Sequence, residues 1–342
     1  MITRTEKIRQ TPVWQHAMAS AIKSIDELLD IVQLSAAELN ISEAARKQFS
    51  LRIPMAYVDN IRPGDPHDPL LKQILPVGEE MRTMENYLDD PVADLDAVAA
   101  KGLLHKYHGR VLLLTTGACA IHCRYCFRRH FPYHEHSANR HDWTSALDYI
   151  KQDTSIHEVI LSGGDPLTLN DDKLSRLVKL LEDIPHVQTL RLHTRLPVVL
   201  PQRICDELLT WISRSRLNCV VVIHSNHAQE MSESVIQALQ RLQQGRVILL
   251  NQAVLLRGIN DNVDKLTDLS HRLFAAGVLP YYLHQLDPVN GAAHFQVSDE
   301  RACYLHEQLR HRLPGYLVPR LVQELPGLKS KSPLVDLMTC EK

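Results

Sequence analysis

Three cysteines in one short run constrain this chain more than any other feature of its sequence. Cys119, Cys123 and Cys126 have the spacing C-x3-C-x2-C, and an apolar run closely precedes them. Three thiolates at this spacing can hold three irons of a four-iron cluster and leave the fourth iron open to a small molecule. A structural zinc site needs four closed ligands, so His122 or His130 would have to complete it within the same loop. The cysteine count therefore favours the iron–sulfur cluster over zinc.

The composition excludes several classes of protein. The 342 residues carry a net charge of −2 without a block of like charges, which argues against a dedicated nucleic-acid binder. No apolar run approaches the roughly 20 residues of a membrane span, and the N-terminus has no signal-peptide core. We therefore expect a cytoplasmic protein with neither a nucleic-acid nor a membrane partner. The other four cysteines are scattered, which argues against a disulfide framework: Cys205, Cys219, Cys303 and Cys340.

Short β-rich runs alternate with amphipathic stretches from about residue 111 onward. The predicted strands are residues 111–115, 158–162, 189–193, 219–224, 247–251 and 280–284. The predicted helices are residues 142–152, 171–183, 202–214, 229–243, 262–276 and 298–312. Repeats of this kind, with strands about 30 residues apart, build parallel sheets. We predict an α/β fold with a partial (β/α)6 barrel, although a doubly wound sheet would give the same local pattern.

Two further parts flank this core. Residues 1–100 read as helices and loops, with capping-box spacing from Ser24 to Glu27 ahead of an apolar stretch. The end of the chain is a loop punctuated by proline and glycine that carries Lys329 and Lys331. We predict an N-terminal helical segment (1–100), a (β/α) core (101–315) and a C-terminal tail (316–342).

Polar side chains gather where the predicted strands end. The cysteine loop follows the first strand, and the run Ser162-Gly163-Gly164-Asp165-Pro166 follows the second. The later strands lead to histidine, arginine, asparagine and aspartate residues, which include His193, Arg195, His224, Asn251, His284 and Asp287. Because α/β barrels place their active sites at the carboxyl ends of their strands, this pattern predicts an enzyme.

The cysteine run resembles the signature of the radical S-adenosylmethionine (SAM) enzymes, with the aromatic Tyr125 before the third cysteine. This resemblance implies a partial or full (β/α) barrel and a [4Fe-4S] cluster on the three cysteines. It also implies that the open iron binds SAM and cleaves it to a 5′-deoxyadenosyl radical. The glycine-rich run is similar to a motif of the same enzymes that binds the methionyl ammonium of SAM. It implies cofactor contacts by Gly163 and Gly164, where the backbone can approach closely, and by Asp165, which can anchor a cation.

Further motifs narrow the resemblance to the lysine 2,3-aminomutase family. They match in order from about residue 50 to the tail, and they include residues 105–114, 126–129, 195–201, 251–261 and 331–333. In that family a tail lysine holds pyridoxal 5′-phosphate (PLP) covalently. The family pattern, lysine followed by serine or threonine and then proline, implies that Lys331 is this lysine and that Lys329 is the weaker candidate. The resemblance thus implies three cofactors: the cluster, SAM and PLP.

The same resemblance implies the substrate contacts. Arg128, two positions after Cys126, matches the family arginine that pairs with the substrate carboxylate. Asp287 matches one of two acids that hold the substrate ε-ammonium. Glu324 stands at the other acidic position, where the catabolic enzymes have aspartate, so its longer side chain leaves that contact open. Lys106 and Arg110 match basic positions near the PLP phosphate.

The implied function is an isomerase that moves the amino group of L-lysine from Cα to Cβ. The catabolic aminomutases continue well past the PLP lysine, whereas this chain stops at Lys342. The shorter form resembles the bacterial enzyme that makes (R)-β-lysine for attachment to elongation factor P by a separate ligase. An external one-electron donor is the other expected partner.

Two alternatives stay open. The first is a free-standing aminomutase of lysine catabolism or β-lysine metabolism. The second belongs to another class, a non-catalytic iron–sulfur or zinc protein, which would have no use for Lys331 or for the glycine-rich run.

Overall fold

One sheet organises the molecule. The computed structural model describes residues 12–136 and 143–340, and in that part of the chain ten strands form the sheet. The strands are β1 (Val98–Ala100), β2 (Leu103–Tyr107), β3 (Arg110–Thr116), β4 (Glu158–Gly163), β5 (Thr189–Thr194), β6 (Asn218–Ile223), β7 (Ile248–Val254), β8 (Leu279–His284), β9 (Arg320–Gln323) and β10 (Ser332–Pro333). Strands β3 to β9 run parallel to one another. β1 and β2 add antiparallel pairs at one edge, and β10 adds one at the other.

The order of the strands decides between the two predicted architectures. Each strand lies beside its neighbours in sequence from β1 to β10. A doubly wound sheet instead reverses its strand order at a switch point. The sheet is therefore a partial barrel, as predicted. All six predicted strands are present within two or three residues of their expected ends.

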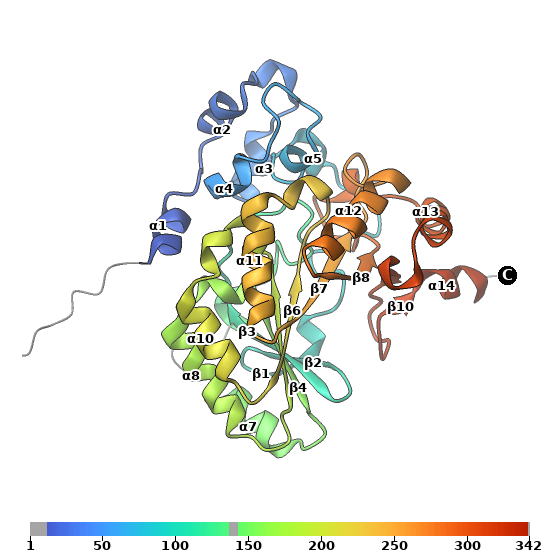
Figure 1. Cartoon of the computed structure of the whole chain (residues 1–342). Helices are drawn as coiled ribbons and strands as arrows, with labels where there is room; N and C mark the ends of the chain where they lie inside the picture. Colours follow the sequence, from blue (N-terminus) through green and yellow to red (C-terminus); the bar gives the residue numbers. More distant parts are fainter. Residues whose placement is uncertain (1–11, 137–142, 341–342) are drawn as a thin grey trace, which may run out of the picture.

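Helices stand around the outside of the strands (Figure 1). The helices are α1 (Val13–Ala19), α2 (Ile25–Val32), α3 (Glu43–Gln48), α4 (Met55–Val58), α5 (Pro69–Lys72), α6 (Tyr133–His136), α7 (Thr144–Gln152), α8 (Asp171–Glu182), α9 (Leu196–Val199), α10 (Asp206–Arg214), α11 (Glu233–Gln244), α12 (Val263–Ala275), α13 (Asp299–Arg312) and α14 (Leu334–Cys340). Short 3-10 turns are η1 (Ala36–Glu38), η2 (Gly78–Met81), η3 (Leu95–Ala97), η4 (Pro166–Thr168), η5 (Pro201–Arg203), η6 (Ala228–Glu230), η7 (Ala293–Phe295) and η8 (Gly315–Leu317). None of the helices in the described ranges is long and apolar enough to cross a lipid bilayer.

The two faces of the barrel strands differ in chemistry, as β5 illustrates. Leu190 and Leu192 are buried in the hydrophobic core that the helices share. Arg191 and His193 alternate with them, so they point to the other face, the inside of the barrel. The barrel interior is thus lined in part by polar side chains, which is the lining that polar ligands require.

The N-terminal helices lie together at one end of the barrel (Figure 1). Helix α2 begins where the capping pattern predicts, because the Ser24 side chain accepts a hydrogen bond from the Glu27 amide. Buried residues of this segment, such as Leu28 and Tyr57, belong to the same hydrophobic core as the barrel. The His122 amide, in the cysteine loop, donates to the Arg52 carbonyl at 3.1 Å. The segment therefore covers the loop that carries the cysteines.

Candidate active site

The three cysteines lie in the loop that leaves the carboxyl end of β3. All three are free and only partly exposed. Burial, and then the neighbouring thiols, raise the pKa of Cys119 above its ordinary value, and burial with Cys123 raises the pKa of Cys126 to about 11. All three thiols thus lie in one loop at the carboxyl end of the strand, where each can ligate one iron of a cluster.

Among the described residues, no group of three or more His, Cys, Asp and Glu side chains is placed to hold one metal ion. An iron–sulfur cluster does not require such convergence, because each thiolate binds its own iron.

A buried carboxylate from the N-terminal segment clamps the cysteine loop. Glu80 in η2 pairs with Arg124 at 2.6 Å and with Arg129 at 2.7 Å, and all three side chains are fully buried. Arg124 also donates to the carbonyl oxygens of Phe49 at 2.5 Å and Ala45 at 3.1 Å. Removing one member of a buried ion pair leaves an uncompensated charge, which costs about 3–5 kcal/mol. The sequence offered no signal for Glu80, because its two arginines lie more than forty residues away.

The glycine-rich run presses against the start of the cysteine loop. Gly163 has φ of +117°, and a Cβ there would lie 2.4 Å from the Thr116 carbonyl oxygen. A Cβ on Gly164 would lie 2.4 Å from the Ala118 carbonyl oxygen. Only glycine permits both the left-handed backbone and this close approach. The two loops that the sequence assigns to the cluster and to SAM are therefore in direct contact.

Asp165 makes contacts within the chain that the sequence did not suggest. Its carboxylate accepts hydrogen bonds from the Thr194 hydroxyl at 2.7 Å and from the backbone amides of Leu167, Arg195 and Leu196 at 2.7–3.2 Å. Burial raises the pKa of Asp165 to about 6, although these hydrogen bonds oppose the shift. Four donors fill the capacity of a carboxylate. Asp165 therefore clamps the chain after β4 to the end of β5, and its role as an anchor for a bound cation stays a prediction.

A chain of alternating charges connects four of the remaining predicted site residues. Arg128 donates to Asp94 at 2.7 Å, and Lys106 pairs with the other oxygen of Asp94 at 2.6 Å. Lys106 also pairs with Glu324 at 3.1 Å, and Glu324 pairs with Lys331. Although burial opposes ionisation, Lys331 and Lys106 lower the pKa of Glu324 to about 2. Four residues that the sequence predicted separately thus meet through Asp94, which the sequence reasoning missed.

The buried polar atoms that lack a partner in the described part of the chain include two on residues at the carboxyl ends of barrel strands. They are Oδ1 of Asp287 and Nε2 of His193. Burial raises the pKa of Asp287 to about 7, with a smaller opposing effect from Lys331. A buried polar atom without a hydrogen bond is costly, so these two atoms favour a polar ligand inside the barrel.

Arg110 stands apart from the charge chain. It begins β3, at the end of the strand opposite the cysteine loop, and its guanidinium lies 4.8 Å from the centre of the Tyr107 ring. No ion pair of Arg110 is found in the described ranges. Its side chain therefore keeps its donors for another acceptor.

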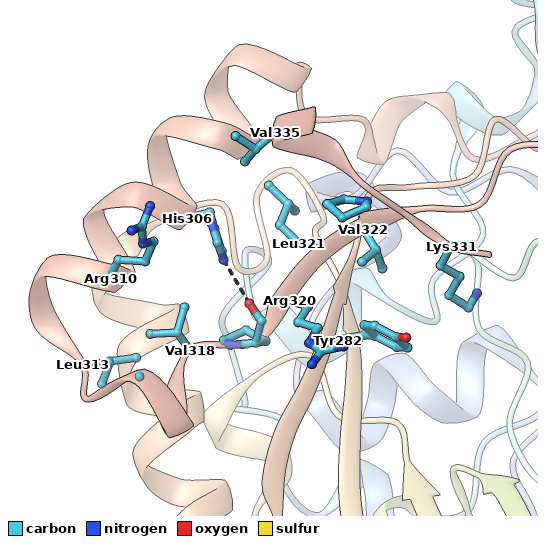
Figure 2. Close-up of a pocket in the computed structure, with 13 residues that line it drawn as sticks. Tyr282, His306, Arg310, Leu313, Val318, Arg320, Leu321, Val322, Lys331 and Val335 are labelled. Atoms are coloured by element: carbon cyan, nitrogen blue, oxygen red, sulfur yellow. Dashed lines mark hydrogen bonds between the residues drawn. The ribbon is translucent and has the colours of Figure 1, made fainter. Parts of the chain in front are cut away.

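A cavity of about 540 Å³ opens beside the last strands. Lys331 lies at one side of it, Arg310 at the other, and Tyr282 and Arg320 between them (Figure 2). Of the residues that the sequence assigned to the site, it contains Lys331 alone. Lys331 is thus reachable from the open edge of the partial barrel.

The chain is similar to several known proteins. A model of the 4Fe-4S single cluster domain matches residues 108–193. L-lysine 2,3-aminomutases from Haemophilus influenzae and Escherichia coli are each 46% identical, over 95% and 94% of this chain and 96% and 94% of their own lengths. The enzyme of the same name from Clostridium subterminale is 35% identical over 94% of this chain and 77% of its own. A radical SAM methyltransferase of known structure from Sphaerobacter thermophilus has a TM-score of 0.46 and 16% identity, over 65% of this chain and 68% of its own.

A partial α/β barrel with a cysteine loop at the carboxyl end of its first parallel strand defines a radical SAM enzyme. The identities above go further, because they extend over nearly the whole chain. The chain belongs to the lysine 2,3-aminomutase family. It is therefore an isomerase of a class whose cofactors are a [4Fe-4S] cluster, SAM and PLP.

Proposed function

We propose that this protein converts L-α-lysine to (R)-β-lysine and that PLP, held by Lys331, is required. The observation that carries the proposal is the charge chain from Arg128 to Lys331. It joins a donor suited to a carboxylate, through Lys106 and Glu324, to the lysine assigned to PLP. A non-catalytic iron–sulfur protein has no need of such an arrangement.

The residues present fit the three cofactors. Cys119, Cys123 and Cys126 would hold the cluster, and the backbone of Gly163 and Gly164 would contact SAM. For PLP, Lys331 would form the covalent bond and Lys106 and Arg110 would lie near the phosphate. The free donors of Arg110 support its part in this set, although its place at the amino end of β3 makes it the most remote member. When bound, the cluster and SAM supply the radical that removes a hydrogen from unactivated carbon, and PLP carries the migrating nitrogen.

The substrate contacts follow from charge and burial. Arg128 donates through Nε to Asp94 and through Nη1 to the Ser162 hydroxyl, which leaves Nη2 of its planar fork for a carboxylate. The unpartnered Oδ1 of Asp287 suits the ε-ammonium of lysine. Glu324 now has two ammonium partners, Lys331 and Lys106. Glu324 would therefore hold the substrate ammonium beside Asp287 only where that ammonium takes the place of one of these two partners.

The decisive experiment identifies the product formed from labelled L-lysine. We expect anaerobically reconstituted protein with PLP, SAM and a reductant to form β-lysine. Cys123→Ala should abolish both β-lysine formation and SAM cleavage, because one iron loses its ligand. Cys303→Ala, a partly exposed cysteine on α13 outside the loop, is the matched control and should keep both activities. An intact holoprotein that forms no β-lysine and cleaves no SAM would refute the enzymatic function.

We propose further that the β-lysine is made for elongation factor P. The support is the motif resemblance together with the higher identity to the Haemophilus and Escherichia relatives than to the clostridial one. In cells that lack this protein, elongation factor P should lose the mass of one lysyl group, and added (R)-β-lysine should restore it. Mass spectrometry of purified elongation factor P measures this change. Unchanged modification in the deletion strain would favour a catabolic or metabolic destination.

A further inference from the structure

Arg195 lies where the loops for the cluster and for SAM meet. It directly follows β5, its side chain is buried, and the residue is only 5% exposed. Its backbone amide donates to Asp165 at 2.7 Å, which fixes the residue to the glycine-rich loop. Its side chain runs the other way, to the cysteine loop, where Nη1 donates to Sγ of Cys123 at 2.6 Å. One residue therefore touches both loops.

The guanidinium of Arg195 has little freedom to leave Cys123. On its far side, Nη2 donates to Gln73 at 2.8 Å, to Glu230 at 3.2 Å and to the Tyr57 hydroxyl at 3.4 Å. The rings of Tyr57 and Tyr125 lie 5.5 and 5.6 Å from its central carbon. The partners of Nη2 thus hold the planar guanidinium in place so that Nη1 faces the sulfur.

A positive charge contacts the sulfur of Cys123, whereas the neighbouring negative charge does not. The buried cation of Arg195 contacts the sulfur directly, whereas its carboxylate partner, Glu230, contacts Nη2 on the other edge of the fork. Nε of Arg195 is also buried and has no partner in the described part of the chain. A second acceptor beside the cysteine loop, such as a cluster sulfide or a bound cofactor, would satisfy this donor.

We infer that Arg195 is a positioning residue that raises the reduction potential of the cluster. The inference rests on the proposed cluster at Cys119, Cys123 and Cys126. Reduction adds one electron from the external one-electron donor to the cluster and forms or breaks no bond. Hydrogen bonds to cluster sulfur and nearby positive charge both stabilise the reduced form. Neither the three-cysteine motif nor the glycine-rich run accounts for this fixed contact.

The test is a redox titration of the reconstituted holoprotein, followed by electron paramagnetic resonance of the reduced cluster. Arg195→Lys and Arg195→Gln should both shift the midpoint potential to more negative values. The shift should be larger for glutamine, because that variant loses the charge as well as the fork. Glu230→Gln should shift it in the opposite direction, because it removes the anion that offsets Arg195. Arg203→Gln is the matched control, a fully buried arginine that packs on Trp14 and contacts none of the three loop cysteines, and it should leave the potential unchanged.

The iron and sulfide contents of the variants distinguish an effect of Arg195 on the reduction potential from a purely structural role. If at least one variant at position 195 or 230 keeps wild-type iron and its potential is unchanged, the inference is wrong. If all three variants lose their iron, Arg195 only builds the pocket, and the inference is again overturned. Failure of the wild-type protein to assemble any cluster would instead refute the proposed function, so the two failures are distinguishable.

Discussion

Replacing Lys331 with alanine is expected to abolish the visible absorbance of protein-bound PLP. We expect turnover to fall by about a thousandfold or more, because the covalent attachment is lost. The change also removes one of the two cations that lower the pKa of Glu324, so binding of the cofactor and of lysine should weaken together. Absorbance spectroscopy of the reconstituted variant and single-turnover product analysis measure the two effects.

Lys329→Ala provides the control for this prediction. Lys329 lies two residues earlier in the same loop and is exposed, whereas Lys331 is partly buried against Glu324. The Lys329 variant should keep both absorbance and turnover. The reverse pattern, with absorbance retained in Lys331→Ala and lost in Lys329→Ala, would show that the PLP lysine has been assigned to the wrong residue.

Asp287→Asn is expected to weaken lysine binding strongly and to remove its pH dependence. Removing the charge that faces a buried ammonium costs about 2–5 kcal/mol, or roughly 30-fold or more in affinity. In the wild-type protein burial raises the pKa of Asp287 to about 7. An ammonium ligand requires the ionised carboxylate, so lysine binding should release a proton below pH 7. Each further pH unit of acidification should then weaken binding by about tenfold.

Calorimetry without SAM or reductant measures this proton release, because the apparent binding enthalpy then depends on the ionisation enthalpy of the buffer. The relevant quantity is the number of protons released on binding of L-lysine minus the number released on binding of norleucine, which lacks the ε-ammonium. Equal proton release for the two ligands, or an unchanged release in Asp287→Asn, would show that Asp287 does not face the substrate ammonium.

The six central strands of the sheet were predictable from the sequence, and the strands at its two edges were not. The six central strands have apolar patterns with clear turns between them, and all six are in the sheet. β1 and β10 have only three and two residues, too few to show an alternation. The local pattern also left the barrel and the doubly wound sheet open, since both consist of the same βα units. Only the pairing of each strand with its sequence neighbours distinguishes them.

The site was predictable where a motif places residues close together in sequence. The cysteine run and the glycine-rich run are of this kind. Asp94 could not be found in this way, because its partners Arg128 and Lys106 come from different elements and meet it only in the folded chain. The clamp that Asp165 forms could not be predicted for a related reason. Three of the four donors to its carboxylate lie where β5 ends and α9 begins, about thirty residues further along.

The clamp on the cysteine loop also bears on how the protein matures during synthesis. Glu80 and the carbonyl groups of Ala45 and Phe49 leave the ribosome before Arg124 and Arg129 do. Because segments nearer the N-terminus emerge first, the acceptors for both arginines are already outside when the three thiols appear. The chain therefore presents the acceptors that hold the cysteine loop before it presents the thiols themselves.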